Sequence, residues 1–291
     1  MFLAVGIFLP VILFVFSITL MVPLLYRTFN DTTFISMFVT VLITLYLLFP
    51  AMLLGVSEFS YVSPLSLAVE MYQGKPLALR SYLTAALPMV LIFCLFVYVG
   101  SRMLNEEFLT SYRPIVRKLA EAIYLSMDRR RPALSVALVS LCLVPVVYLA
   151  QLGALAVALN LPVRLAMGGI LIASVVIEEV AKSVAIVMLL EHGNVKRWHR
   201  VVILSLLSAT GFLLGEKALL FVSIRATSQS LLAAVMLNAG KLWITLGAHF
   251  VFTVVISLLT RWWGPKRYPL ALGVGASIHL LYNLAILGVL G

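Results

Sequence analysis

Two adjacent acids and a lysine interrupt an apolar stretch of the sequence, in the order Glu178-Glu179-x-x-Lys182. The stretch, residues 165–190, is long enough to cross a bilayer as a helix. Each ionised group at the centre of a bilayer costs about 2.5–3.5 kcal/mol on insertion scales. This cost predicts a functional site inside the membrane, in which neighbouring carboxyl groups could divide the roles of acid and base.

Further polar residues lie inside the three apolar segments that follow. Glu216 comes four residues after Phe212, and His249 lies in the next segment. His279 and Asn283 are four apart in the last segment, hence on one face of a helix. At a rise of about 1.5 Å per residue, all these groups fall in one band near the middle of the membrane. We therefore predict that they converge in one site.

The spacing also predicts roles within this site. Glu178 and Lys182 are four apart and share a face, so the lysine could keep one carboxylate ionised. Glu179 points about 100° away and is predicted to orient its neighbours. His279 and Asn283 are suited to donating hydrogen bonds to a developing oxyanion. The alternative is a structural role for each group, with Lys182 as a counter-ion.

The composition determines the class of protein. Of the 291 residues, 63% are hydrophobic and 11% charged, and the mean hydropathy is +1.12, whereas soluble domains carry about 25% charged residues. In lipid, a helix satisfies its own backbone hydrogen bonds. We predict an all-α, polytopic bundle of about eight membrane-spanning helices. They are residues 2–25, 33–54, 82–104, 133–159, 165–190, 201–224, 242–260 and 270–290.

The basic residues predict the orientation of these helices. Most of the 21 Lys and Arg residues lie at the loops after the first, third, fifth and seventh segments. The positive-inside rule puts these loops in the cytoplasm and both termini outside, and we expect the plasma membrane. Anionic lipid at the membrane surface accounts for the net charge of +10, so the bilayer is an expected partner and nucleic acid is not.

The polar groups divide the chain into two parts. Residues 1–132 contain three spans without ionisable groups at depth, followed by a cytoplasmic loop. In that loop Ile115, Leu119, Ile123 and Met127 recur every four residues, as in an amphipathic helix on the inner leaflet. We expect accessory helices in this part and the catalytic bundle in residues 133–291.

Small residues beside the polar ones predict close helix packing. Gly211 and Gly215 form a small-xxx-small pair just before Glu216, a pattern that lets two membrane helices approach closely. The same expectation applies to the glycines of the other polar segments, Gly168, Gly169, Gly247, Gly273 and Gly275.

The ordered motifs resemble the PrsW family of intramembrane proteases, within the CAAX protease and bacteriocin-processing superfamily. They are Glu178-Glu179-x-x-Lys182, Gly211-Phe212-x-x-x-Glu216, His249 and His279-x-x-x-Asn283, and the resemblance covers about residues 174–286. CAAX enzymes usually carry Glu-Glu-x-x-x-Arg and Phe-x-x-x-His. Lys182 and Glu216 depart from that pattern in the way that PrsW does, which weakens the case for prenylated substrates.

The resemblance implies an endopeptidase that cleaves membrane-associated proteins, a single-pass protein in the case of PrsW. Glu178 would be the general base that activates water, and Glu216 would share that water. His279 and Asn283 would polarise the scissile carbonyl, Glu179 and Lys182 would orient and balance charge, and His249 would assist. No cofactor is expected.

Other uses of the same residues stay open. Glutamate and histidine also suit zinc or another divalent metal, although the spacing is not that of a His-Glu-x-x-His site. Buried carboxylates and histidines also form the proton relays of transporters, although no internal repeat of the transporter kind is visible. A non-catalytic membrane scaffold could use the same contacts structurally.

Overall fold

We describe the protein from a computed structural model, which describes residues 2–25, 29–52, 54, 58–104, 108, 114–224, 231–286 and 288. These residues form α-helices and short 3₁₀ helices, without a β-strand. Within these described ranges, six helices are long and apolar enough to cross a membrane. The protein is thus an integral, polytopic, all-α membrane protein, as the composition predicts.

The count of eight spans remains a prediction. The apolar part of α2 (Phe29–Ala51) is the shorter segment Ile35–Ala51. The helix α8 (Val163–Glu191) has 29 residues, which suffice to span, but its apolar run is interrupted by Glu178, Glu179 and Lys182. The two uncertain spans therefore differ in kind, one being short and the other carrying the candidate site.

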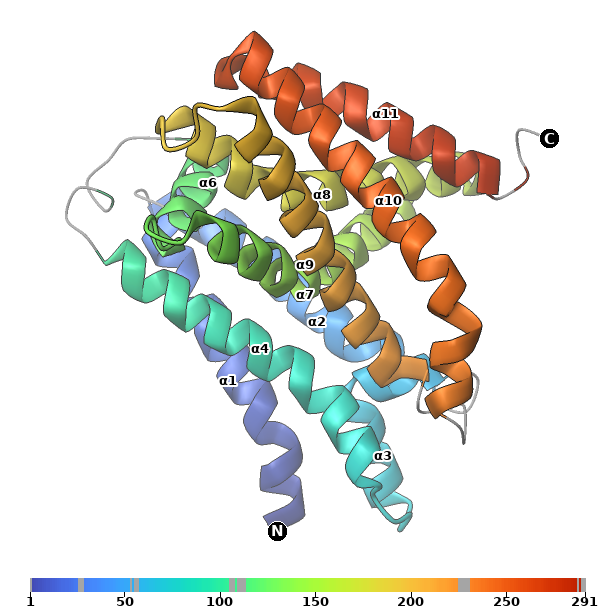
Figure 1. Cartoon of the computed structure of the whole chain (residues 1–291). Coiled ribbons are helices and arrows are strands. Elements are labelled where there is room, and N and C mark those ends of the chain that lie inside the picture. The colour runs from blue at the N-terminus through green and yellow to red at the C-terminus, as the bar shows by residue number, and fades with distance from the viewer. Residues whose placement is uncertain are drawn as a thin grey trace. The chain divides into compact units, whose positions relative to one another are not determined.

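The chain divides into two compact units, and the first comprises residues 1–125 together with 217–237. Its elements are α1 (Phe2–Leu25), α2, η1 (Glu58–Val62), α3 (Pro64–Tyr72), α4 (Leu79–Met103) and α6 (Ile115–Ser126). The helices α1 and α4 lie side by side (Figure 1), and a Cβ at Gly100 would lie 3.2 Å from Met21 Sδ. Phe108, and Ala122 of α6, complete the buried cluster around Met21.

Two short helices of this unit refine the sequence prediction. The sequence did not predict α3, which begins where Ser63 accepts a hydrogen bond from the Leu65 amide (3.2 Å) and Pro64 occupies the first helical turn. The helix α6 forms where predicted, but Lys118 is only 2% exposed, with Nζ 5.4 Å from the centre of the Phe108 ring. Leu119 is 43% exposed. The location of α6 on the inner leaflet stays a prediction.

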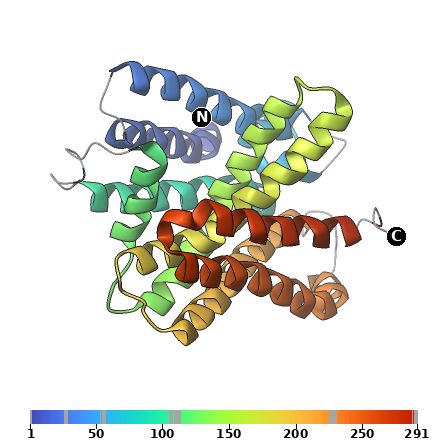
Figure 2. The ribbon, with the colours of Figure 1, turned by 90° about the horizontal axis from the view of Figure 1, so that it is seen from above.

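The second unit comprises residues 126–216 and 238–291 and contains the predicted site. Its elements are α7 (Pro132–Ala158), α8, α9 (Trp198–Ile224) up to Glu216, α10 (Leu231–Trp263) from Asn238, η2 (Pro265–Arg267) and α11 (Tyr268–Ile286). The end of α7 and the start of α8 form a hairpin (Figure 2). Gly264, at φ +90, makes the turn after α10, because few other residues adopt this conformation. This turn brings α11 back alongside α10 in both views.

Two glycines hold α9 against α7, directly beside Glu216. A Cβ at Gly211 would lie 2.1 Å from the Ala137 carbonyl oxygen, and one at Gly215 would lie 2.9 Å from that of Leu141. Pro145 has no N–H, so it cannot donate the helical hydrogen bond to Leu141. The predicted close packing at Gly211 and Gly215 is confirmed, and it covers the carbonyl that the proline leaves without its helical donor.

The same expectation is wrong for most of the other glycines. A Cβ at Gly168, Gly169, Gly247 or Gly273 would meet nothing within 4 Å, because these residues face away from the described neighbours. Gly275 alone among them is closely packed, because a Cβ there would lie 2.2 Å from Ile256 Cγ1 of α10. Small size permits close approach, but the face that a glycine occupies decides whether a helix is there.

These contacts predict opposite effects of alanine at two glycines. Gly211→Ala should destabilise the protein by about 1–3 kcal/mol, because the new methyl group meets rigid backbone. Gly169→Ala, in open space on α8, should be neutral or slightly stabilising, because alanine favours a helix by up to about 1 kcal/mol. Thermal unfolding of both purified variants in detergent measures the difference. Equal effects would contradict the α7–α9 packing.

Candidate active site

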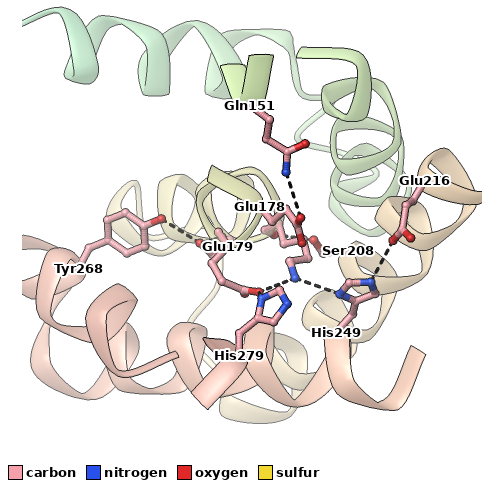
Figure 3. Close-up of polar contacts among 10 residues, drawn as sticks. Gln151, Glu178, Glu179, Ser208, Glu216, His249, Tyr268 and His279 are labelled. Atoms are coloured by element: carbon pink, nitrogen blue, oxygen red, sulfur yellow. Dashed lines mark hydrogen bonds and ion pairs between the residues drawn. The ribbon is translucent and has the colours of Figure 1, made fainter. Parts of the chain in front are cut away.

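The polar groups of the second unit meet in one cluster, which we call the polar centre (Figure 3). Five helices contribute to it, although the sequence predicted only four. Its members are Gln151 from α7, Glu178, Glu179 and Lys182 from α8, Glu216 from α9, His249 from α10 and His279 from α11. The structure therefore brings together every predicted site residue except Asn283.

A fully buried ion pair lies at the middle of the polar centre. Lys182 Nζ donates to Glu179 Oε1 at 2.5 Å, and both side chains have 0% exposure. The sequence placed Glu178 on the same face as Lys182 but left open which carboxylate the lysine keeps ionised, and in the structure Lys182 contacts Glu179. Positions three apart also share a helix face, and here Glu179 is on the side of α8 that faces His279. Glu179 is therefore the central carboxylate.

A histidine and two aromatic rings also surround the ammonium group of Lys182. Nζ lies 3.1 Å from His249 Nδ1, 5.2 Å from the centre of the Phe212 ring and 5.7 Å from that of Phe252. Aromatic faces attract a cation, and more so where water is excluded. The backbone carbonyl of Lys182 accepts a hydrogen bond from Ser208 of α9 (2.5 Å). Lys182 thus joins α8 to both α9 and α10.

The contact with Lys182 determines the tautomer of His249. An ammonium group only donates hydrogen bonds, so Nδ1 of His249 accepts and its ring proton must be on Nε2. That nitrogen is 3.2 Å from Glu216 Oε2 and donates to it. The side chain of Glu216 is 39% exposed, whereas that of His249 is 8% exposed. Glu216 is therefore linked to the ion pair through His249.

His279 takes the opposite tautomer because it faces the carboxylate. Its Nδ1 donates to Glu179 Oε1 at 2.7 Å, and Phe252 stacks on its ring at 4.5 Å and 15°. Nε2 is thus the nitrogen that stays available to a ligand. Asn283, four residues further along α11, is half-buried and forms no hydrogen bond with any described residue of the polar centre. The two residues lie one turn apart on α11, as predicted, and the role of Asn283 stays a prediction.

Glu178 stands apart from the ion pair. It is half-buried, and Gln151 Nε2 donates to its Oε1 at 3.1 Å. No described cation forms an ion pair with it. Two adjacent glutamates therefore have different environments, one neutralised within the protein core and the other held by an amide. Such a difference is what separates the roles of two carboxyl groups in acid–base catalysis.

Several residues in or next to the polar centre were not assigned from the sequence. Gln151 was visible only as a polar residue near the end of an apolar segment. Ser183 donates to the Glu179 carbonyl at 2.6 Å, and Tyr268 of α11 contacts the Ser183 hydroxyl at 2.9 Å. Serine and tyrosine are common in membrane helices, so only the folded arrangement reveals this link between α8 and α11.

The structure offers no ready metal site in the part of the chain that it describes. No three His, Cys, Asp or Glu side chains gather closely enough to hold an ion there. The reason lies in Lys182, whose ammonium occupies the position between Glu179 and His249 that a metal bound to both would take. These donors do not suit zinc as they stand, so we derive no catalytic step through a metal.

Comparison with known protein families, curated proteins and solved structures finds no match to this chain. The resemblance to PrsW therefore remains a prediction from the motifs.

The ion pair predicts a non-additive pair of substitutions. Lys182→Met should destabilise the protein by about 3–5 kcal/mol, because it leaves Glu179 charged and buried without its cation. Adding Glu179→Gln should recover much of that loss, since it removes the uncompensated charge. Denaturant unfolding of the single and double variants in detergent measures the coupling. Additive losses would show that the two groups do not depend on each other.

Proposed function

We propose that the protein is an intramembrane endopeptidase that hydrolyses peptide bonds of membrane-associated proteins. The observation that carries this proposal is the unequal pair of carboxylates: Glu179 forms a buried ion pair with Lys182, whereas Glu178 accepts a hydrogen bond from Gln151 and forms no ion pair with a described residue. A carboxylate that is partly open and not ion-paired is suited to accept a proton from water. The motif resemblance to PrsW supports the same role for Glu178.

The proposed reaction is general-base hydrolysis. Glu178 takes a proton from a water molecule as the water oxygen bonds to the scissile carbonyl carbon. The tetrahedral intermediate then collapses, the C–N bond breaks, and Glu178 passes the proton to the leaving nitrogen. Positioned acid–base groups of this kind typically contribute about 10²–10⁴-fold to a rate.

The other residues of the polar centre position the reacting groups and stabilise the charge that develops in the reaction. His279 could donate from Nε2 to the developing oxyanion when both of its nitrogens carry protons, and the adjacent Glu179 carboxylate would balance that charge. Lys182 and His249 hold Glu179 and Glu216 in place. The resemblance gives Asn283, one turn further along α11 than His279, a share in the oxyanion contact. Glu216, whose side chain is 39% exposed, would help to hold the water.

The substrate and the orientation are part of the proposal. A substrate that reaches the polar centre has to enter from the bilayer or its edge, which favours a membrane protein. The Lys and Arg distribution supports both termini outside and a plasma-membrane location. We propose that the second unit carries the reaction and that the helices of residues 1–132 are accessory.

The proposal predicts new peptide termini that depend on Glu178. Membranes from cells that express wild type or Glu178→Gln are compared by mass spectrometry of protein N-termini. Glutamine has the same size but cannot accept the proton, so cleavage near transmembrane segments should fall by about 10²-fold or more. The measurement detects hydrolysis and identifies the substrate together.

Glu191→Gln is the matched control, because it makes the same chemical change at the far end of α8. It should leave the termini as in wild type. If wild type and Glu178→Gln give identical termini at equal abundance, the enzyme hypothesis is wrong. The scaffold and the proton-coupled transporter would then be the candidates that remain.

A further inference from the structure

Two buried hydroxyl groups on α10 form no hydrogen bond with any described residue, not even with the backbone carbonyl one turn earlier in their own helix. Thr253 Oγ1 and Ser257 Oγ are fully buried, and neither has a hydrogen-bond partner in the described part of the chain. Burying a hydroxyl without a partner costs about 1–3 kcal/mol on the scale of protein mutations. Native structures seldom carry such groups unless water satisfies them.

The contrast with other hydroxyls of this chain makes the two residues unusual. A serine or threonine in a helix commonly donates to the carbonyl four residues earlier. Thr260 does so on the same helix, to Ile256 at 2.7 Å, and so does Ser205 on α9, to Val201 at 2.9 Å. Thr253 and Ser257, on the same helix as Thr260, form no such bond to a described carbonyl.

Both residues lie on the side of α10 that carries His249. They follow it at intervals of four and eight residues, so all three are on adjoining parts of one helix face. Phe252 and Ile256 occupy the next face, where they contact His279 and Gly275 of α11. The two hydroxyls therefore extend from His249 toward the end of α10 at Trp263, over a rise of about 1.5 Å per residue.

The neighbouring helix places more polar groups at the same level. Phe212 of α9 packs against His249 at 5.5 Å, and the two helices run in opposite directions (Figure 1). One turn back along α9 from Phe212 is Ser208, and Ser205 follows, both with 0% exposure. In this register, Ser208 is level with Thr253 and Ser205 with Ser257.

A third oxygen without a partner lies where this line reaches the polar centre. Glu179 Oε2 is buried, and no described residue donates to it. A buried water typically makes two to four hydrogen bonds to protein, so it needs several polar groups within reach. The hydroxyls of α9 and α10 and this carboxylate oxygen provide such a set in an otherwise apolar bundle.

We propose that Thr253 and Ser257 bind a short line of water molecules that leads to His249 and Glu179. The ligand is water, and the line connects the polar centre with the Trp263 end of α10. It would supply water and exchange protons with a site that the bilayer isolates. This proposal concerns the bundle itself and does not depend on peptide hydrolysis, so a negative result with Glu178→Gln leaves it intact.

Water contact at His249 can be measured directly by solid-state NMR. The chain has four histidines. A His192→Gln/His199→Gln background, which changes the two histidines outside the polar centre, leaves the ring signals of His249 and His279. Magnetisation transfer from water to the ring N–H of His249 should be fast in this protein in lipid bilayers. Thr253→Val with Ser257→Ala should slow it several-fold.

Thr210→Val is the matched control, since it removes a hydroxyl of α9 that is exposed and donates to its own helix. It should leave the transfer rate unchanged. Ser257→Ala alone serves as the smallest change if the double variant does not fold, and it should also slow the transfer. Unchanged transfer in whichever of these variants folds would overturn the proposal.

Thermal unfolding gives an independent test, because the two explanations predict opposite signs. If the hydroxyls are dry, deleting them removes an unsatisfied group and raises the unfolding temperature. If they hold water, the deletion removes hydrogen bonds, and the unfolding temperature falls or stays the same. A rise in the double variant, with no rise in Thr210→Val, would overturn the proposal.

Discussion

The buried ion pair between Lys182 and Glu179 is the contact on which the polar centre depends. Two opposite charges withdrawn from water gain little net energy from each other, because desolvation offsets most of their attraction. Removing one partner is costly, because the other is then left charged in an apolar bundle. The pair therefore makes the arrangement obligatory: Lys182, once buried, must be surrounded by the groups that satisfy it.

The two histidines take their orientation from this pair. Lys182 donates to Nδ1 of His249, which turns the Nε2 proton toward Glu216, while Glu179 accepts from Nδ1 of His279 and leaves its Nε2 available. The same pair separates the adjacent glutamates, since the cation that neutralises Glu179 leaves Glu178 to Gln151. A single contact between two side chains of α8 thus organises groups on α9, α10 and α11.

The sequence predicted the helices and the residues of the site better than the contacts between those residues. Apolar runs with few charges place most of the long helices within a few residues, although α10 begins at Leu231, well before the predicted start at residue 242. Charges at depth mark Glu178, Glu179, Lys182 and Glu216 because lipid makes them costly. Spacing alone could not decide whether Lys182 pairs at three or four residues, since both positions share its face. Nor could it reveal Gln151 or Tyr268, whose roles depend on how α7 and α11 pack on α8.

The measurement that tests this account most directly is the protonation pattern of the two buried histidine rings. Nitrogen NMR of histidine-labelled protein distinguishes a ring nitrogen that carries a proton from one that does not. The account predicts a bare Nδ1 on His249 and a protonated Nδ1 on His279, and it predicts that Lys182→Met alters the His249 pattern. A proton on Nδ1 of His249 in the wild-type protein would contradict it, because the ammonium of Lys182 could not then donate there.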